Sequence, residues 1–312
     1  MPGVPPTRFT YLGPEGTFSE QALRRIPAAK RAELRPARSV PDALDAVRDA
    51  DADAALVPLE NSVEGAVGVT LDQLAEGDPL VITREVVLPV TFVLATRVGR
   101  GLDEIRTVAS HPHATAQCRD WLHKNLPQAA IVDVLSTAAA AAAVAKGEHD
   151  AAICAPIAVE RHRLNPVAED IGDHPDAVTR FVLVSRVGAP PAPTSNDVTS
   201  IVVYIAHDRV GSLLGVLTEL AVRGINLTRI ESRPVNNRLG QYCFFLDCTG
   251  HVADARMGEA LMGLRRTSAA VRFLGSYPRA SPEKITAPPG TADADFSDAV
   301  AWLSRLRHGG VE

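Results

Sequence analysis

The sequence has little of what nucleic-acid-binding and membrane proteins need. Acidic side chains outnumber basic ones by 37 to 32 among 312 residues, and aromatic residues make up only 4%. Nucleic-acid binding ordinarily requires a basic surface, and single-strand binding requires aromatic stacking platforms. No apolar run approaches the roughly 18 residues of a membrane span, and the N-terminus lacks a basic segment followed by an apolar core. We therefore expect a cytoplasmic protein that binds neither nucleic acid nor membrane.

Cofactor motifs are missing as well. The sequence contains no G-x-G-x-x-G after a strand, no G-x-x-x-x-G-K-[ST] and no G-x-S-x-G nucleophile elbow. His111 and His113 have no cysteine or carboxylate cluster beside them in the sequence, which disfavours a metal site. The scattered cysteines without a C-x-x-C pair predict reduced, buried thiols; they are Cys118, Cys154, Cys243 and Cys248. We expect no metal and no cofactor.

The first part of the chain, residues 7–186, alternates short apolar strands with amphipathic helices, which predicts a mainly parallel α/β sheet. It also contains an internal echo. Ser39 precedes Asp53 by 14 residues, and Ser136 precedes Asp150 by 14 residues. Each pair frames a Ser-capped helix followed by Asp-Ala-Ala at the start of an apolar strand. Unless two αβ units look alike by chance, the echo predicts two lobes with an anion-binding cleft between them.

The second part begins after a proline-rich linker over residues 187–197. Residues 198–277 read as strand, helix, strand, strand, helix, strand, the βαββαβ order of an α+β ferredoxin-like sandwich. A domain of this size leaves a sheet face or edge exposed, which favours pairing with a second subunit. Residues 278–312 form a tail with a short amphipathic helix, FSDAVAWLSRL.

Polar turns follow several of the expected strands. In YLGPEGTFSE, Thr17 and Glu20 form a capping box at a helix start, and two glycines allow a ligand to approach the backbone. In VPLENSVEG, an acid, an amide and a hydroxyl end a buried strand, where ligand sites of α/β sheets lie. These residues are Glu60, Asn61 and Ser62. The structural alternatives are an ordinary capped turn for the first stretch and a plain loop for the second.

Two further stretches carry polar groups. In SHPHATAQC, Ser110 is expected to cap a helix and, with the first free amides, to bind a ligand carboxylate. In DAVTRFVLVSR, Arg180 offers a bidentate partner for a carboxylate, and Thr179 offers a hydroxyl for a leaving oxygen. The structural alternative is an edge strand in which Thr179 favours the strand and Arg180 pairs at the edge.

Taken in order, GPEGTFSEQAL, PLENSVEG, SHPHATAQC, DAVTRFVLVSR and GINLTRIESRP resemble a bacterial prephenate dehydratase with a C-terminal ACT regulatory domain. The resemblance reaches to about Tyr277. It implies a carbon–oxygen lyase of phenylalanine biosynthesis that decarboxylates and dehydrates prephenate to phenylpyruvate without cofactor or metal. It also implies a two-lobed catalytic domain like that of periplasmic binding proteins.

The resemblance assigns roles to the polar turns. It makes Thr179 the essential residue, and the chemistry of the reaction makes Glu60, which the resemblance places in the cleft, a candidate proton source. The implied catalytic residues are Thr179, Arg180, Glu60, Asn61 and Ser62, and the implied substrate-binding residues are Thr17, Ser110, His111, Gln117 and Phe181.

The ACT resemblance implies that phenylalanine binds at the interface of a homo-oligomer, either a dimer or a tetramer. The implied effector residues are Gly211, Ser212, Leu213, Leu214, Asn226, Leu227, Glu231 and Ser232. The loop Val210-Gly211-Ser212-Leu213 departs from the usual Pro-Gly-Ala-Leu of the family but keeps its glycine. Arogenate dehydratase and a non-catalytic amino-acid sensor stay open as alternatives, although neither a secretion signal nor a DNA-binding helix pair accompanies the sensor interpretation.

Overall fold

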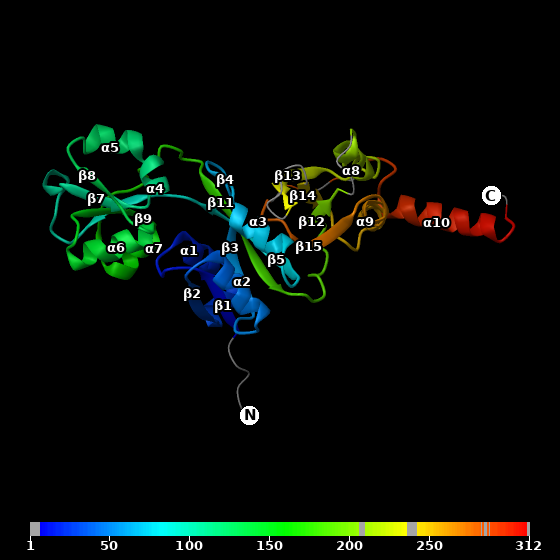
Figure 1. Cartoon of the computed structure of the whole chain (residues 1–312), viewed down its shortest axis with the longest axis horizontal. Coiled ribbons are helices and arrows are strands. Elements are labelled where there is room, and N and C mark those ends of the chain that lie inside the picture. Colours follow the sequence, from blue (N-terminus) through cyan, green and yellow to red (C-terminus); the bar gives the residue numbers. More distant parts are fainter. Residues whose placement is uncertain are drawn as a thin grey trace, which may run out of the picture. The chain divides into compact units, whose positions relative to one another are not determined.

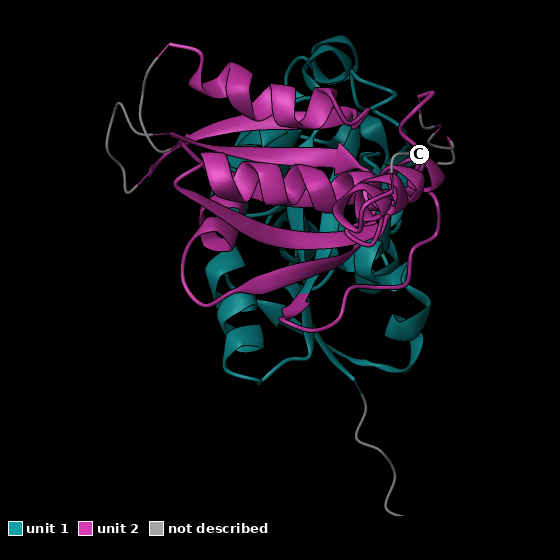
Figure 2. Cartoon of the chain, turned by 90° about the vertical axis from the view of Figure 1, so that its right-hand side faces the viewer, with its two compact units in different colours: residues 1–70, 86–184 teal, residues 71–85, 185–312 magenta. Residues whose placement is uncertain are grey.

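The computed structural model describes residues 7–205, 210–235, 242–281, 283, 286 and 288–310. Ala206, the last residue of the expected strand VTSIVVYIA, and Gly240–Gln241, the start of the expected strand GQYCFFLDC, lie outside the described residues. The chain divides into two compact units (Figure 1, Figure 2). Unit 1 comprises Met1–Thr70 and Val86–Val184, and unit 2 comprises Leu71–Glu85 and Ser185–Glu312. The second unit therefore takes in a short internal segment together with the C-terminal part of the chain.

Unit 1 begins with a lobe whose sheet has the strand order β2-β1-β3-β11-β5, with β4 paired to β3. The strands are β1 (Arg8–Leu12), β2 (Glu33–Ala37), β3 (Ala54–Asn61), β4 (Gly65–Ala66), β5 (Leu80–Pro89) and β11 (Val178–Arg186). The helices are α1 (Phe18–Arg24) and α2 (Val40–Arg48), with a 3-10 helix at Pro27–Arg31, and α3 (Gly68–Ala75) begins in this unit and continues into unit 2 from Leu71. β1 pairs in parallel with both β2 and β3, as the βα alternation predicts. Phe9, Tyr11, Leu23 and Phe181 lie in its apolar core.

The second lobe of unit 1 has its own sheet, in the order β10-β6-β9-β7-β8. Its strands are β6 (Val93–Thr96), β7 (Thr107–Ser110), β8 (Ala130–Asp133), β9 (Ala151–Cys154) and β10 (Asn165–Ala168). Its helices are α4 (Pro112–Ala116), α5 (Arg119–Asn125), α6 (Thr137–Lys146) and α7 (Pro156–His162), with a 3-10 helix at Leu102–Glu104. Two lobes with separate sheets confirm the two-lobed α/β prediction.

The internal echo corresponds to the same local structure in both lobes. Ser39 caps α2 and Ser136 caps α6, each accepting a hydrogen bond from the amide three residues ahead. α2 leads into β3, and α6 leads into β9. Since each lobe uses the same capped helix and following strand, the 14-residue spacing marks a structural repeat.

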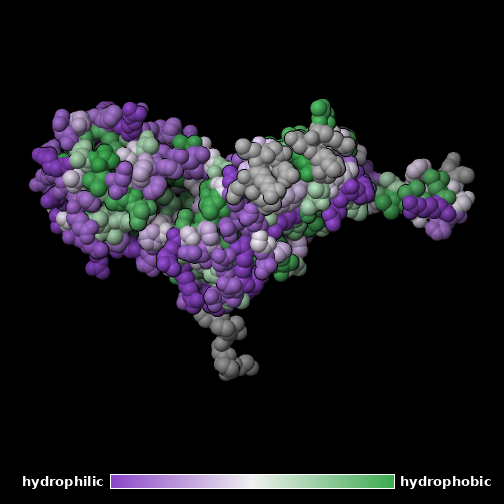
Figure 3. Space-filling view, in the orientation of Figure 1, coloured by the Kyte–Doolittle hydropathy of each residue, from purple (hydrophilic) through white to green (hydrophobic). Residues whose placement is uncertain are grey.

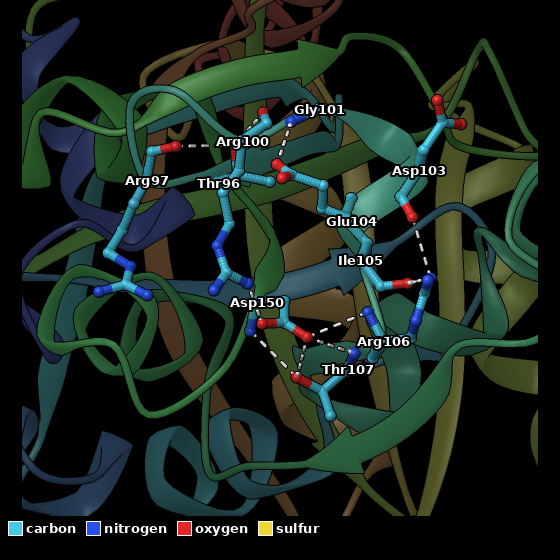
Figure 4. A network of polar contacts seen from close by, with 10 residues as sticks. All are labelled: Thr96, Arg97, Arg100, Gly101, Asp103, Glu104, Ile105, Arg106, Thr107 and Asp150. Carbon is cyan, nitrogen blue, oxygen red and sulfur yellow. Dashed lines mark hydrogen bonds and ion pairs between the residues drawn. The ribbon is translucent and has the colours of Figure 1, made fainter.

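The two aspartates of the echo also have the same role. Asp53 Oδ2 accepts from the backbone amide of Arg8 at the start of β1, at 2.7 Å. Asp150 Oδ2 accepts from the amide of Thr107 at the start of β7, at 3.0 Å, and its other oxygen contacts Arg100 (Figure 4). Burial opposes the ionisation of Asp150, but the amide and guanidinium donors outweigh it and lower its pKa. In each lobe, the aspartate that precedes β3 or β9 therefore fixes the start of the parallel neighbour, β1 or β7.

Unit 2 contains a four-stranded antiparallel sheet in the order β13-β14-β12-β15. Its strands are β12 (Asp197–Tyr204), β13 (Leu227–Pro234), β14 (Tyr242–Thr249) and β15 (Ala270–Pro278), and its helices are α8 (Ser212–Ala221) and α9 (Ala255–Thr267). Side chains such as Ile201, Leu220, Leu246 and Leu264 form the core between the sheet and the helices. This arrangement confirms the ferredoxin-like βαββαβ prediction.

The tail ends in α10 (Asp293–Arg307), which starts three residues before the expected helix. None of its residues is buried. Val300, Trp302 and Leu303 are exposed beside charged residues, and the space-filling view shows both kinds of surface on this helix (Figure 3). Across the described part of the chain, no helix combines the length and the apolar character needed to cross a membrane.

Candidate functional site

The structure brings Asn61 and Thr179 together although 118 residues separate them. Asn61 ends β3, and Thr179 is the second residue of β11, the neighbouring strand of the same sheet. The amide Nδ2 of Asn61 donates to Thr179 Oγ1 at 2.8 Å. Thr179 is 8% exposed, so this hydrogen bond is largely shielded from water.

The turn after β3 determines which way the Asn61 amide faces. Asn61 Oδ1 accepts from the backbone amides of Val63 and Glu64, at 2.8 and 3.0 Å. Only the oxygen end of an amide can accept, so Nδ2 must face Thr179. The Thr179 oxygen is therefore an acceptor towards Asn61, and its own proton is directed to another partner.

Ser62 holds this turn against the start of β11. Its backbone amide donates to the carbonyl of Val178 at 2.9 Å, and its hydroxyl accepts from the amide of Val178 at 3.0 Å. Ser62 thereby uses both groups to fix the residue directly before Thr179. The structure gives Ser62 a positioning contact with the strand that carries the hydroxyl.

The other predicted residues of this lobe lie on the same two strands. Glu60 is half-buried on β3, one residue before Asn61. Arg180 is half-buried on β11, and Phe181 is buried in the lobe core. Because side chains alternate along a strand, Thr179 and Phe181 share one face and Arg180 lies on the other.

The second lobe contributes a contact to the same turn. Gln117 Nε2 donates to Glu64 Oε1 at 3.2 Å, and His113 Nδ1 lies 3.8 Å from the other oxygen of Glu64. Gln117 is 7% exposed, and its amide oxygen is buried without a hydrogen-bond partner among the described residues. Sequence reasoning had not selected Glu64, because a lone exposed carboxylate in a turn carries no signal of what faces it.

The start of α4 differs from the expectation in one respect. His111, not Ser110, is the N-cap residue, and its Nδ1 accepts from the amide of His113. Ser110 is fully buried on β7, and its hydroxyl donates to the carbonyl of Ile153 at 2.8 Å. Partial burial, together with His113, holds the pKa of His111 below its usual range.

Thr17 caps α1 as predicted, accepting from the Glu20 amide and donating to the carbonyl of Leu12. Glu20 accepts from the amide of Gly16 and forms ion pairs with Arg24 and Arg161. Burial opposes ionisation of this carboxylate, but the donors outweigh it and lower its pKa. Since α1 belongs to the first lobe and α7 carries Arg161, this ion pair joins the two lobes. The capping box identified Glu20 but not its partner 141 residues away.

The predicted effector residues lie in unit 2. Gly211 precedes α8 with φ of 86°, a left-handed conformation that favours glycine, and apart from its chain neighbours none of the described residues lies within 4 Å of where a Cβ would be. Leu214 is 67% exposed in the first turn of α8. Asn226 directly precedes β13. Its backbone amide donates to Thr249 Oγ1, and its backbone carbonyl accepts from the backbone amide of Thr249. The other predicted residues are Ser212 and Leu213 on α8 and Leu227, Glu231 and Ser232 on β13.

The side chains at the Asn61–Thr179 site offer hydrogen bonding and charge. Among the residues that the structure describes, no group of three His, Cys, Asp or Glu side chains is placed to hold a metal ion. The site offers the Thr179 hydroxyl and the side-chain amides of Asn61 and Gln117. The carboxylates of Glu60 and Glu64 lie on the same strand and turn as Asn61. Such a set can position a polar substrate and donate to a departing oxygen.

The fold and site define a two-lobed α/β domain joined to an ACT-type regulatory domain. Residues 9–189 match the prephenate dehydratase family, and residues 199–266 match the ACT domain. The chain is 52% identical over 304 residues to the prephenate dehydratase of Amycolatopsis methanolica, covering 97% of this chain and 99% of that protein. The chain belongs to the prephenate dehydratase family.

Solved structures agree with this assignment. The prephenate dehydratase of Arthrobacter aurescens in complex with L-Phe has a TM-score of 0.92 and 48% identity, covering 97% of this chain and 100% of that one. The prephenate dehydratase of Staphylococcus aureus has a TM-score of 0.75 and 27% identity, covering 87% and 100%. GqqA, described as a quorum quenching acylase, has a TM-score of 0.79 and 28% identity, covering 88% and 98%.

Proposed function

We propose that this protein is a carbon–oxygen lyase that converts prephenate to phenylpyruvate. Its family membership supports the reaction. The observation that carries the mechanism is the fixed orientation of Asn61, which makes the Thr179 oxygen an acceptor and directs the hydroxyl proton towards a ligand.

The reaction needs only modest assistance. Carbon dioxide leaves from the ring carboxylate, and its bonding electrons complete an aromatic ring as the ring hydroxyl departs from the opposite carbon. In our proposal, Thr179 donates a hydrogen bond to the departing oxygen, which leaves as water once it has gained a proton. Glu60, next to Asn61 on β3, is the proposed proton source. A threonine hydroxyl is too weak an acid to supply that proton itself.

Two other groups complete the proposed substrate site. On the family resemblance, Arg180 is the proposed partner for the side-chain carboxylate of prephenate, although the strand places its side chain on the face of β11 opposite Thr179. The buried amide oxygen of Gln117 has no donor among the described residues, so a substrate hydroxyl or a bound water would satisfy it. The ring carboxylate is expected to lie where anions are poorly solvated, because desolvation favours its loss.

We propose that phenylalanine regulates this activity by binding the ACT domain in a homo-oligomer. The Arthrobacter aurescens relative was solved in complex with L-Phe. The effector carboxylate would approach the open backbone at Gly211 and the start of α8, and the β13 residues would contact the rest of the amino acid. The four cysteines are free and buried, which fits action in the reducing cytoplasm.

The direct test is ultraviolet detection of phenylpyruvate from purified protein and prephenate in metal-free buffer, with and without phenylalanine. Formation of phenylpyruvate that phenylalanine suppresses is the expected result. Activity on arogenate but not on prephenate would instead support arogenate dehydratase. If the folded protein is inactive on both substrates, the proposed function is contradicted. The result would then favour the non-catalytic amino-acid sensor.

A further inference from the structure

A segment from the first part of the sequence packs against the four-stranded sheet β13-β14-β12-β15 of the ACT domain, which we call the regulatory sheet. Leu71–Glu85, which contains most of α3 and the first half of β5, belongs to unit 2 with the ACT domain. Arg272 on β15 donates to the carbonyls of Ala75, Glu76 and Gly77 at the end of α3. The backbone of Gly275 lies so close to Ile82 that a Cβ would be 2.2 Å from its carbonyl oxygen.

A bidentate ion pair joins α3 to the strand β13. Arg233 donates through Nε to Asp72 Oδ1 at 3.0 Å and through a terminal nitrogen to Asp72 Oδ2 at 2.6 Å. This paired geometry is directional, because two parallel bonds hold the guanidinium and the carboxylate in one plane. The side chains are 32% and 45% exposed, so the pair is expected to add more to orientation than to stability.

The other end of α3 is fixed to the strand that carries Asn61. Thr70 is fully buried, and its hydroxyl donates to the carbonyl of Pro58 on β3 at 2.6 Å. The amide of Val67 donates to the carbonyl of Leu59. Thr70 and Asp72 are two residues apart on α3, so the same helix carries the contact with β3 in its first turn and the contact with β13 directly afterwards.

Arg233 also lies close to two residues of the proposed effector site. Ser232 precedes it, and Glu231 is two residues before it, on the same face of β13. A ligand that moves Glu231 or Ser232 would therefore also move the Arg233 backbone. Displacement of Arg233 would be transmitted through the ion pair to α3.

We propose that Asp72 and Arg233 are positioning residues that couple phenylalanine binding on the ACT domain to the Asn61–Thr179 site. The path runs from β13 through the ion pair to α3, and from the first turn of α3 to β3 and the turn that orients Asn61. This inference rests on the proposed function, since it concerns how the effector reaches that active site.

The test compares full-length wild type with Asp72→Asn and Arg233→Gln. For each protein we would measure phenylpyruvate formation against phenylalanine concentration and phenylalanine affinity by calorimetry. Both variants should retain phenylalanine affinity and, without phenylalanine, kcat/KM within about threefold, while the effect of saturating phenylalanine on kcat/KM should be at least about tenfold smaller than in wild type, a loss of about 1.4 kcal/mol of coupling. The double variant should be no less responsive than either single variant, because both remove one interaction.

Arg272→Gln is the matched control. It removes another arginine that links the same sheet to the same helix, but from β15 and not from the effector strand. It should lower stability while preserving inhibition. An equal loss of inhibition in Arg272→Gln, or full inhibition in Asp72→Asn, would overturn the proposal.

Hydrogen exchange gives a readout that does not need activity. Phenylalanine should change the exchange of the amides of residues 62–66 in wild type but not in Asp72→Asn. If wild type binds phenylalanine and shows this change but does not act on prephenate, the proposed function fails while the coupling stands. If the change is the same in both proteins, the coupling fails whatever the activity.

Discussion

At the scale of single residues, the candidate site depends on hydrogen bonds that allow only one orientation of the Asn61 amide and the Thr179 hydroxyl. The amides of Val63 and Glu64 orient Asn61, and Asn61 in turn orients the hydroxyl of Thr179. Ser62 fixes the backbone of the preceding residue in β11. Each group is held by a neighbour, so the hydroxyl is positioned before substrate arrives, which is the condition for electrostatic catalysis.

Replacing Thr179 by valine should remove catalysis while keeping the shape of the side chain. Without a donor for the departing oxygen, kcat should fall by about 100-fold or more, and KM should change little. Thr179→Ser, which keeps the hydroxyl, is the matched control and should retain most of the activity. An unchanged kcat for the valine variant in the phenylpyruvate assay would remove Thr179 from the mechanism.

His111 should make the stability of the protein depend on pH. Its lowered pKa means that the folded protein binds a proton less readily than the unfolded chain does. Stability is therefore complete above the unfolded pKa of about 6.5 and declines as the pH falls through the folded pKa. His111→Asn keeps an N-cap acceptor but cannot titrate. Urea unfolding at pH 7.5 and 5.5 should show a smaller loss for this variant, and equal losses would contradict the assignment.

At the scale of elements, each lobe of unit 1 is built on one capped helix and strand with an aspartate between them. Asp53 accepts an amide hydrogen bond at the start of β1, and Asp150 accepts amide hydrogen bonds at the start of β7. The carboxylates thus accept hydrogen bonds from backbone amides that the adjacent strand leaves unpaired. A buried amide without a partner is costly, which accounts for the same acid at both places.

Asp150→Asn should lower the free energy of unfolding by about 1–3 kcal/mol, because an amide accepts fewer and weaker hydrogen bonds than a carboxylate. The contribution of the carboxylate is present above its unfolded pKa, ordinarily 3.8, and is lost as the pH falls through the lower folded value. Asp103→Asn is a control, since Asp103 joins the same network only through its backbone carbonyl (Figure 4). Urea unfolding followed by the fluorescence of Trp121, on α5 of the same lobe, would measure both. Equal stabilities of the two variants would show that the carboxylate is dispensable.

At the scale of the whole molecule, the chain does not divide into its units at a single linker. Residues 187–196, within the expected linker over residues 187–197, lie between β11 and β12, and Leu71–Glu85 also belongs to the second unit. Leu71, Leu74, Leu80 and Ile82 are almost completely buried. The second unit therefore includes a segment that lies more than 100 residues earlier in the chain than the strands of its sheet.

Gly275→Ala should disrupt this packing. Gly275 has φ of 139°, and its added Cβ would lie 2.2 Å from the carbonyl oxygen of Ile82, so strain and a steric clash add together. A loss of about 2–5 kcal/mol is expected in thermal or urea unfolding. Gly99→Ala is the control with φ of 91° but open space around it, and it should cost only about 1–2 kcal/mol. Similar losses in the two variants would show that the contact with Ile82 is unimportant.

The sequence by itself determined the local structure and the family. Ser39, Ser136 and Thr17 cap helices because a side-chain oxygen reaches an amide three residues ahead, an interaction wholly contained in the local sequence. Strand alternation and the βαββαβ order have the same local origin. The ordered polar turns identified the prephenate dehydratase resemblance before any contact between them was known.

Only the tertiary structure decided which distant groups meet. The hydrogen bond from Asn61 to Thr179, the contact of Gln117 with Glu64 and the ion pair of Asp72 with Arg233 span 118, 53 and 161 residues. No local periodicity encodes such pairs, because they depend on the order of strands in a sheet and on how lobes and sheets pack. The sequence could place Thr179 at a strand start, but its hydroxyl acquired a direction only when β3 and β11 became neighbours.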